Sequence, residues 1–334
     1  MMQISPETQL FIREHSSDDV RVLALQAKKY PDIDMPTAIT QIAGRKVAAE
    51  KIPSWWEIEK IWYPKHLSLE QCSSEITARY KARLLQGDSL TDLTGGFGID
   101  CSFLATGFKS ATYVERQEEL CEIAAHNFPV LNLNHINIKN EDGVTYLQAM
   151  SPVDCLFLDP ARRNEHGGKT VAISDCEPNV AELEELLLQK ANRVMIKLSP
   201  MLDLSLALKE LKQTQEVHIL SVNNECKELL ILLGQTSPTE ISIHCVNLST
   251  KGTQEEQHFV FTREQEQCSE CTYTDSLETY LYEPNASLLK AGAFRSIAAA
   301  YPVRKLHPNS HLYTSDTFIE NFPGRIFRIV NPVS

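Results

Sequence analysis

This chain of 334 residues lacks long apolar runs, and that absence excludes a helical membrane protein. No run approaches the roughly 20 consecutive apolar residues that a membrane-spanning helix needs. A secretory signal is missing as well, because the amino terminus, MMQISPETQLFIREHSSDD, is polar and acidic where such a signal is basic and then apolar. We therefore expect a cytoplasmic protein that has no membrane partner.

A regular cysteine framework is also absent. Apart from one close pair, Cys268 and Cys271, the nine cysteines are scattered through apparent strands and helices, which suits a reducing compartment. The pair could be half of a zinc site, but no second C-x-x-C and no C-x-x-H follows at a plausible spacing. We therefore expect no metal ligands in this chain.

Acidic residues outnumber basic ones along the chain except near the carboxyl terminus. The formal net charge is −12, yet residues 284–334 carry six basic and two acidic residues, a balance of +4 that leaves −16 for the remainder. An acidic body repels polyanions, so any nucleic-acid contact should concentrate on this tail and on basic clusters near a site. A merely solvated charged face is the alternative explanation of the tail.

The length of the chain suggests two or three domains, and the patterns along it predict three regions. Residues 1–85 are expected to be helical, with Ser17-Asp18-Asp19 as one helix cap and Pro36 at the start of another helix. Residues 86–234 alternate short apolar runs with amphipathic helices, which predicts a parallel sheet covered on both faces. Residues 235–334 then carry mixed signals, typical of a small α+β domain.

The last two strand-like runs of the middle region break the alternation. Only residues 223–227 link Val217–Val222 to Glu228–Leu233, which is too short for a crossover helix, so these strands should form an antiparallel hairpin. Beyond them, Glu240–Leu248 and His258–Thr262 are expected as strands of the carboxyl-terminal domain.

The stretch SLTDLTGGFGID, from Ser89 to Asp100, predicts a strand, an acidic residue at its end and a glycine-rich turn that opens a helix. Glycines permit positive φ and let a ligand approach the backbone, and a helix N-terminus presents N–H groups to it. A tight connection without a ligand is the alternative. Counting a G-x-G-x-x-G fingerprint from Gly96 and Gly98 puts Cys101 at the third glycine, which disfavours a nicotinamide enzyme.

Four acidic residues follow expected strands of this region, where ligands of open α/β sheets bind. They are Asp92, Glu115, Asp142 and Asp159. Glu115, nineteen residues after Gly96, could accept both hydroxyls of a ribose, and Asp142 could accept an adenine amino group. Each alone is more often a helix cap or a loop residue, but the four together favour a nucleotide-type site.

The order D-L-T-G-G-F-G, Glu115, Asp142 and D-P-A-R, followed by a hairpin, resembles class I S-adenosylmethionine-dependent methyltransferases over residues 70–234. The resemblance implies an α/β fold with a Rossmann-like seven-stranded sheet and S-adenosylmethionine as cofactor. The segment 71–81 is similar to a helix that closes over the methionine end in bacterial RNA methyltransferases with a THUMP-like carboxyl-terminal domain, and residues 282–325 resemble that domain. The implied cofactor-binding residues are Ser74, Asp92, Leu93, Thr94, Gly95, Gly96, Gly98, Glu115, Arg116, Asp142 and Gly143.

The loop Asp159-Pro160-Ala161-Arg162 bears on the substrate. In the resembling base methyltransferases it reads (N/D/S)-P-P-aromatic, or D-P-P-R for uracil C5, so Ala161 and the missing aromatic are departures. Carbon methylation needs a cysteine nucleophile, but Ala161 and residues 197–200, KLSP, stand where the families carry it. Transfer to nitrogen or oxygen requires mainly alignment of the acceptor.

Basic residues around this loop complete the predicted site. The predicted catalytic residues are Asp159, Pro160, Arg162 and Lys197, with Asp159 accepting a proton or hydrogen bond from the acceptor. Phosphate or base edges could be bound by Arg162, Arg163, His166, Lys169 and Lys197, and ion pairs with nearby acids are the alternative for the two arginines.

Together these features predict methyl transfer to a base nitrogen of structured RNA, either tRNA or rRNA. The first alternative is a methyltransferase acting on a small molecule or a protein. The second is a non-catalytic RNA-binding protein.

Overall fold

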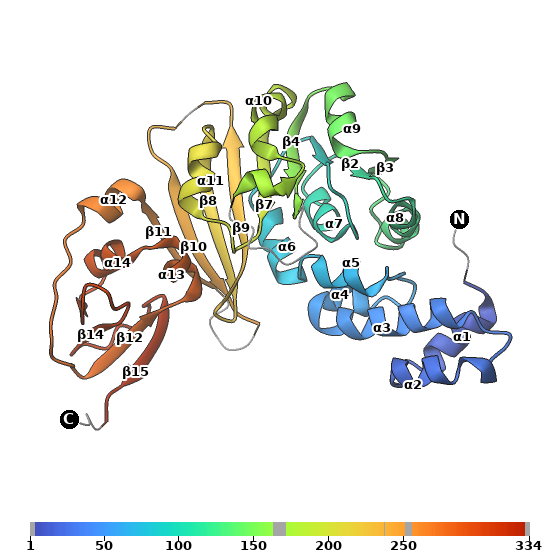
Figure 1. Cartoon of the computed structure of the whole chain (residues 1–334), viewed down its shortest axis with the longest axis horizontal. Coiled ribbons are helices and arrows are strands. Elements are labelled where there is room, and N and C mark those ends of the chain that lie inside the picture. Colours follow the sequence, from blue (N-terminus) through green and yellow to red (C-terminus); the bar gives the residue numbers. More distant parts are fainter. Residues whose placement is uncertain (1–3, 163–171, 237, 251–255, 331–334) are drawn as a thin grey trace. The chain divides into compact units, whose positions relative to one another are not determined.

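The computed structural model describes residues 4–162, 172–236, 238–250 and 256–330. The chain divides into two compact units, Met1–Leu158 with Gln189–Asn192, and Asp159–Leu188 with Arg193–Ser334. Figure 1 labels the elements of both units. None of the helices in the described ranges is long and apolar enough to cross a membrane.

The first unit begins with helices, as predicted for residues 1–85. Asp19 caps one of them, because its side chain accepts a hydrogen bond from the Arg21 N–H, and Pro36 lies in the first turn of the longest. Helix α3 contacts α1, α2, α4 and α5, which places it at the centre of this group (Figure 1). The helices are α1 (Pro6–Glu14), α2 (Val20–Leu25), α3 (Met35–Lys51), α4 (Pro53–Trp56), α5 (His66–Gln71) and α6 (Glu75–Ala82), with a 3-10 turn at Ala27–Lys29.

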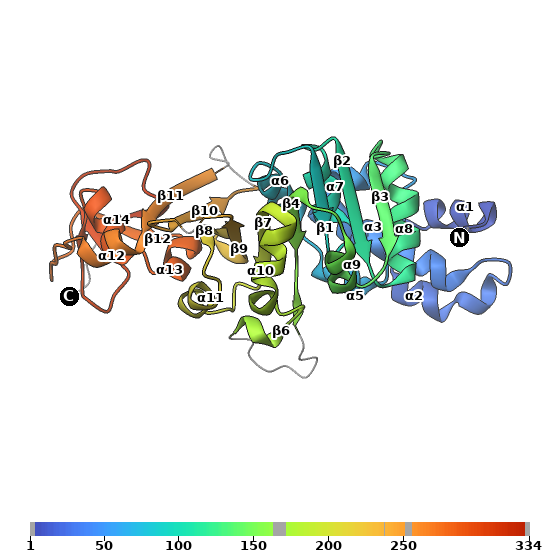
Figure 2. The ribbon, with the colours of Figure 1, turned by 90° about the horizontal axis from the view of Figure 1, so that it is seen from above.

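A parallel sheet follows in the same unit, with strand order β3-β2-β1-β4. Its strands are β1 (Ser89–Asp92), β2 (Ser110–Glu115), β3 (Ile136–Asn140) and β4 (Val153–Leu158), and α7 (Ile99–Ala105), α8 (Glu118–Val130) and α9 (Gly143–Ala149) connect them. Figure 2 shows α8 beside β3 and β2, which it contacts. Since parallel strands share one direction, the carboxyl ends of β1, β2 and β3 meet at one edge.

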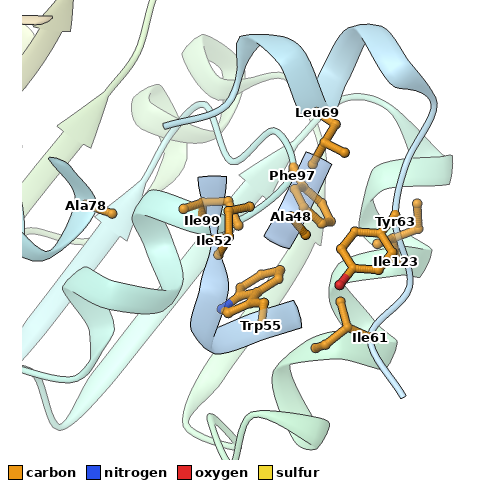
Figure 3. Packing of buried hydrophobic residues seen from close by; sticks show 10 residues of the cluster. All are labelled: Ala48, Ile52, Trp55, Ile61, Tyr63, Leu69, Ala78, Phe97, Ile99 and Ile123. Carbon is orange, nitrogen blue, oxygen red and sulfur yellow. The ribbon is translucent and has the colours of Figure 1, made fainter. Parts of the chain in front are cut away.

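Phe97, in the glycine turn, anchors the amino-terminal helices to this sheet. Its ring is 4% exposed and meets the Trp55 ring edge-on at 5.2 Å between centroids, with the Tyr63 ring at 6.3 Å. All three belong to one buried cluster with residues of α3, α5, α6, α7 and α8 (Figure 3). Trp55 is therefore a packing residue, whereas its neighbour Trp56 is 41% exposed.

The second unit is built on a mostly antiparallel sheet, with order β7-β9-β8-β10-β11. The predicted hairpin is present between β8 and β9, and its turn is only Asn223 and Asn224, both with positive φ. Two residues with positive φ match the twist of paired strands, and asparagine tolerates that conformation. The strands are β7 (Ala191–Leu198), β8 (Thr214–Val222), β9 (Glu225–Gly234), β10 (Ser242–Leu248) and β11 (Glu256–Thr262).

Strands β10 and β11 correct one expectation. Both lie close to the predicted positions, but β10 pairs in parallel with β8, so they extend this sheet and do not join the strands of the tail. The tail has its own antiparallel sheet, with order β13-β14-β12-β15. Its elements are β12 (Tyr280–Pro284), α13 (Ala286–Ala291), α14 (Phe294–Ala300), β13 (Arg304–Lys305), β14 (Tyr313–Ser315) and β15 (Gly324–Arg328).

Smaller elements complete the second unit. The short strands β5 and β6 pair antiparallel after Asp159. Helix α10 buries Val180 and Leu187. The remaining elements are β5 (Ala161–Arg162), a 3-10 turn at Ile173–Asp175, β6 (Cys176–Glu177), α10 (Val180–Lys190), α11 (Leu204–Glu210) and α12 (Arg263–Cys268).

We predict that Phe97→Ala lowers the free energy of unfolding by about 3–5 kcal/mol, the usual cost of emptying an aromatic site in a core. Urea denaturation followed by circular dichroism measures it. The control is Leu25→Ala, at a side chain that is 87% exposed, which should change stability by no more than about 0.5 kcal/mol. Equal effects of the two substitutions would contradict the role given to Phe97.

Candidate active site

The glycine turn has the backbone that its sequence predicts. Gly96 and Gly98 have φ of 55° and 85°, and the Gly98 N–H donates to the Gly95 carbonyl at 2.8 Å before α7 begins. A Cβ on Gly95 would lie 2.3 Å from the Tyr113 ring, whereas one on Gly96 would meet nothing closer than the Thr94 carbonyl oxygen at 3.8 Å. Gly95 is therefore needed for packing, and Gly96 faces open space that a ligand could fill.

Glu115, at the end of β2, holds this turn. One of its carboxylate oxygens accepts the Gly96 N–H at 2.9 Å and the other accepts the Gln117 N–H at 2.8 Å. The Tyr113 hydroxyl donates to the Gly96 carbonyl at 2.5 Å, and burial raises the pKa of Tyr113 well above its ordinary value. An ionised carboxylate has about four acceptor positions, so Glu115 can hold the turn and still accept ribose hydroxyls.

Residues after β1 and β3 also come together at this edge. Asp92 is buried and accepts the Thr94 N–H at 3.0 Å. A Cβ on Gly143 would lie 2.2 Å from the Leu93 carbonyl oxygen, so only glycine allows the two segments to approach so closely. The structure therefore gathers the predicted residues Asp92, Leu93, Thr94 and Gly143.

Asp142 and Arg116 are the most exposed of the predicted cofactor residues. Asp142 caps α9, because its Oδ1 accepts the N–H groups of Val144 and Thr145, each at 3.0 Å. The cap is the alternative role that the sequence left open, and it orients the carboxylate next to Gly143. A contact of Asp142 or Arg116 with a cofactor stays a prediction.

Sequence reasoning missed a buried charge cluster beside Ser74, whose hydroxyl lies 3.2 Å from that of Thr77. The Lys81 ammonium is completely buried, 3.0 Å from Asp100 Oδ1, and donates to the Ser73 hydroxyl at 2.9 Å. That hydroxyl donates in turn to Asp100 Oδ2 at 2.7 Å. The cluster joins α6 to α7, the helix that the glycine turn opens, although no sequence spacing relates Lys81 to Asp100.

In the second unit, the structure brings Asp159 and Lys197 together. The Lys197 ammonium lies 2.6 Å from Asp159 Oδ2, and the side chains are 9% and 36% exposed. A charge-assisted hydrogen bond this short fixes the carboxylate's orientation. Pro160 is buried, and Ala161 and Arg162 are held by strand pairing with Glu177 and Cys176. The other predicted basic residues, Arg163, His166 and Lys169, lie outside the described residues.

We predict that Lys81→Met destabilises the protein by about 3–5 kcal/mol, because it leaves the Asp100 carboxylate buried beside no cation. The double variant Lys81→Met/Asp100→Leu should regain most of that loss, since an apolar pair needs no charge compensation. Thermal and urea unfolding of both variants measure the difference. A single variant as stable as the parent would show that the cluster does not tie α6 to α7.

A family model described as a ferredoxin-like domain matches residues 280–323, within the tail. Among curated proteins, none matches the chain. The structure of an rRNA methylase from Streptococcus thermophilus matches 48% of this chain and 93% of its own, with 14% identity and a TM-score of 0.34. The structure of SMU.1697c of Streptococcus mutans, in complex with SAH, matches 48% of this chain and 96% of its own, with 13% identity and a TM-score of 0.35. These two similarities are too low to bear on function.

A full-length similarity carries more weight. The crystal structure of a protein from Porphyromonas gingivalis W83, described as a putative methyltransferase, matches 100% of this chain and 85% of its own, with 34% identity and a TM-score of 0.86. The predicted fold class is thereby confirmed, with β1 to β4 and the hairpin of β8 and β9 in their expected order along the chain. This chain belongs to the methyltransferase family of the Porphyromonas gingivalis protein.

Proposed function

We propose that the enzyme uses S-adenosylmethionine and transfers its methyl group to a base nitrogen of structured RNA, either tRNA or rRNA. The observation that supports this cofactor is the turn at Gly96, whose N–H group is hydrogen-bonded to the Glu115 carboxylate and which has open space beside Gly96. The cofactor supplies an electrophilic methyl group on a sulfonium. Everything else that the reaction needs is positioning by this chain.

The residues present fit that cofactor. The turn at Gly95 to Gly98 with Asp92 would hold the methionine portion, since the turn leaves open space at Gly96 and Asp92 supplies a buried carboxylate. Glu115 would hold the ribose hydroxyls, and Asp142 with Gly143 would lie along the adenine edge. These carboxylates and the glycine turn therefore match the groups of an adenosine that carries an amino-acid tail.

We predict that Glu115→Gln weakens S-adenosylmethionine binding by about tenfold or more, equivalent to about 1.4 kcal/mol. An amide cannot accept the Gly96 and Gln117 N–H groups and two hydroxyls together. Isothermal titration calorimetry measures the Kd. Glu118→Gln, three residues away at an exposed position of α8, is the matched control and should bind as the parent does. If the parent shows no saturable binding, the cofactor proposal is wrong.

The Asp159 and Lys197 pair supports transfer to an amine acceptor. We infer that Asp159, partly exposed, accepts a hydrogen bond from the acceptor N–H and aims the nitrogen lone pair, while buried Lys197 positions the carboxylate. In the loop at Asp159 and in residues 197–200 no cysteine is present for covalent addition to a pyrimidine. Nitrogen is therefore the acceptor atom that we propose.

The proposal that RNA is the substrate depends on the basic tail, and contacts within the tail reduce the positive charge that is available to RNA. Arg304 forms an ion pair with Glu278, Arg325 forms one with Glu283, and Lys305 is buried. These contacts neutralise part of the tail's positive charge, so Arg328, which is exposed, and the loop after Asp159 would carry more of the attraction to phosphates. A cytoplasmic location and a THUMP-like role of the tail are part of this proposal.

The same ion pairs and the acidic body favour the second candidate, a methyltransferase of a small molecule or a protein. The two candidates differ in the product. Incubation of the enzyme with tritiated S-adenosylmethionine and RNA from a deletion strain, followed by nucleoside analysis, should place the label in a base. Label in protein or in small molecules would refute RNA as the substrate, and no transfer to any acceptor despite cofactor binding would favour a non-catalytic RNA-binding protein.

We predict that Asp159→Ala abolishes methyl transfer and leaves S-adenosylmethionine binding within about tenfold, or about 1.4 kcal/mol. The carboxylate is expected to orient the acceptor and not to hold the cofactor. Single-turnover transfer and calorimetry on the same preparation separate the two effects. Asp275→Asn, at an exposed acid of the second unit, serves as the control, and a parallel loss of binding and transfer would show that the role of Asp159 is misplaced.

A further inference from the structure

A row of histidines crosses the outer strands of the second unit's sheet. Glu216 and His218 are two apart on β8, so they point to the same face. His244 on β10 is directly opposite His218 in the parallel register, and His258 on β11 is opposite Val246, two residues beyond His244. Pairing of three strands thus brings one carboxylate and three imidazoles onto one face.

The distances within this group are those of metal ligands. One ligand atom from each of Glu216, His218 and His244 lies within 4.8 Å of the other two. His218 Nε2 lies 3.3 Å from Glu216 Oε2, and the rings of His218 and His244 stack with centroids 4.3 Å apart. Two ligands about 2.0–2.1 Å from a tetrahedral zinc ion lie roughly 3.3–3.4 Å apart. The His218 and Glu216 atoms already have this spacing, and the His244 ligand atom, within 4.8 Å of both, would move closer on binding.

Burial and neighbouring groups orient these side chains toward one another. His218 is 2% exposed, and Glu216 and His244 are half-buried. The Arg193 guanidinium lies 3.2 Å from Glu216 Oε1, which leaves Oε2 directed at His218. His258 Nε2 lies 3.1 Å from His244 Nδ1, the kind of outer contact that orients a ligating imidazole.

We propose that Glu216, His218 and His244 bind a divalent transition-metal ion, with zinc as the best match. Two imidazoles and one carboxylate are ligands that zinc accepts in tetrahedral sites, and the fourth position would be filled by water. His258 would hold His244 in place. The ion would link β8 to β10 and so stabilise the sheet extension that the tail packs against through α13.

This site is separate from the proposed cofactor site and does not depend on it. The expectation that the chain has no metal ligands considered only the cysteine pair. Sequence analysis did not identify the histidines as ligands because they are 26 and 14 residues apart, which matches no metal-binding motif. Only the strand register brings them together.

The test titrates the full-length protein with zinc chloride and with cobalt chloride after chelation and removal of bound metal. The Cys268→Ser/Cys271→Ser background removes one exposed thiol and one partly exposed thiol. Metal content after gel filtration and calorimetry give stoichiometry and Kd, and the cobalt spectrum distinguishes nitrogen and oxygen ligands from thiolates. Unfolding curves with and without zinc provide a readout that involves no catalysis.

We expect one zinc ion per chain, a cobalt spectrum without thiolate charge-transfer bands, and a higher Tm with zinc. His244→Phe, which keeps the stacked ring, and Glu216→Gln should each weaken binding by at least about tenfold, since loss of even an outer contact of a ligand costs roughly 10- to 100-fold. The control His126→Phe, at a ring stacked on Trp62, should bind as the background does. Thiolate bands, or affinity unchanged in both folded site variants, would overturn the proposal.

Discussion

The hydrogen bond between the Gly96 N–H and the Glu115 carboxylate is the interaction on which the first unit's site depends. It joins the turn after β1 to the end of β2, and the Tyr113 hydroxyl bonds the carbonyl of the same glycine. A turn held at both its N–H and its carbonyl group keeps its positive-φ conformation without a bound ligand. The proposed cofactor would therefore meet a preorganised surface, which lowers the entropy lost on binding.

Packing behind the turn gives the helices before the sheet a structural role in this chain. Phe97 points away from the open side of the turn into the cluster with Trp55 and Tyr63, and the buried Lys81 and Asp100 pair joins α6 to α7. Within the turn, Phe97 and Gly95 thus serve packing, and Gly96 is the glycine that faces open space. The amino-terminal helices support the site and are not an appendage to it.

In the second unit, an added strand covers the edge of the sheet. Its hairpin of β8 and β9 ends the predicted methyltransferase sheet, and β10 then pairs with the outer side of β8, which would otherwise be an edge open to association. That added strand brings His244 beside His218. The proposed metal site is thus a consequence of covering an edge strand. Its His218 lies two strands from Lys197 in the same row of the sheet, because both are opposite Leu230 of β9.

The sequence by itself determined the alternation of strands and helices, the glycine turn, the acidic residues at strand ends and the hairpin, because each depends on local spacing: periodicity, glycine at positive φ and a link too short for a helix. The family fold came from the resemblance to class I methyltransferases. Only the tertiary structure decided that Lys81 pairs with Asp100, that Asp159 pairs with Lys197, that β10 joins β8 and not the tail, and that three histidines share one face. Those contacts join residues distant in sequence, and their partners are set by strand register and packing, which single-sequence patterns do not encode.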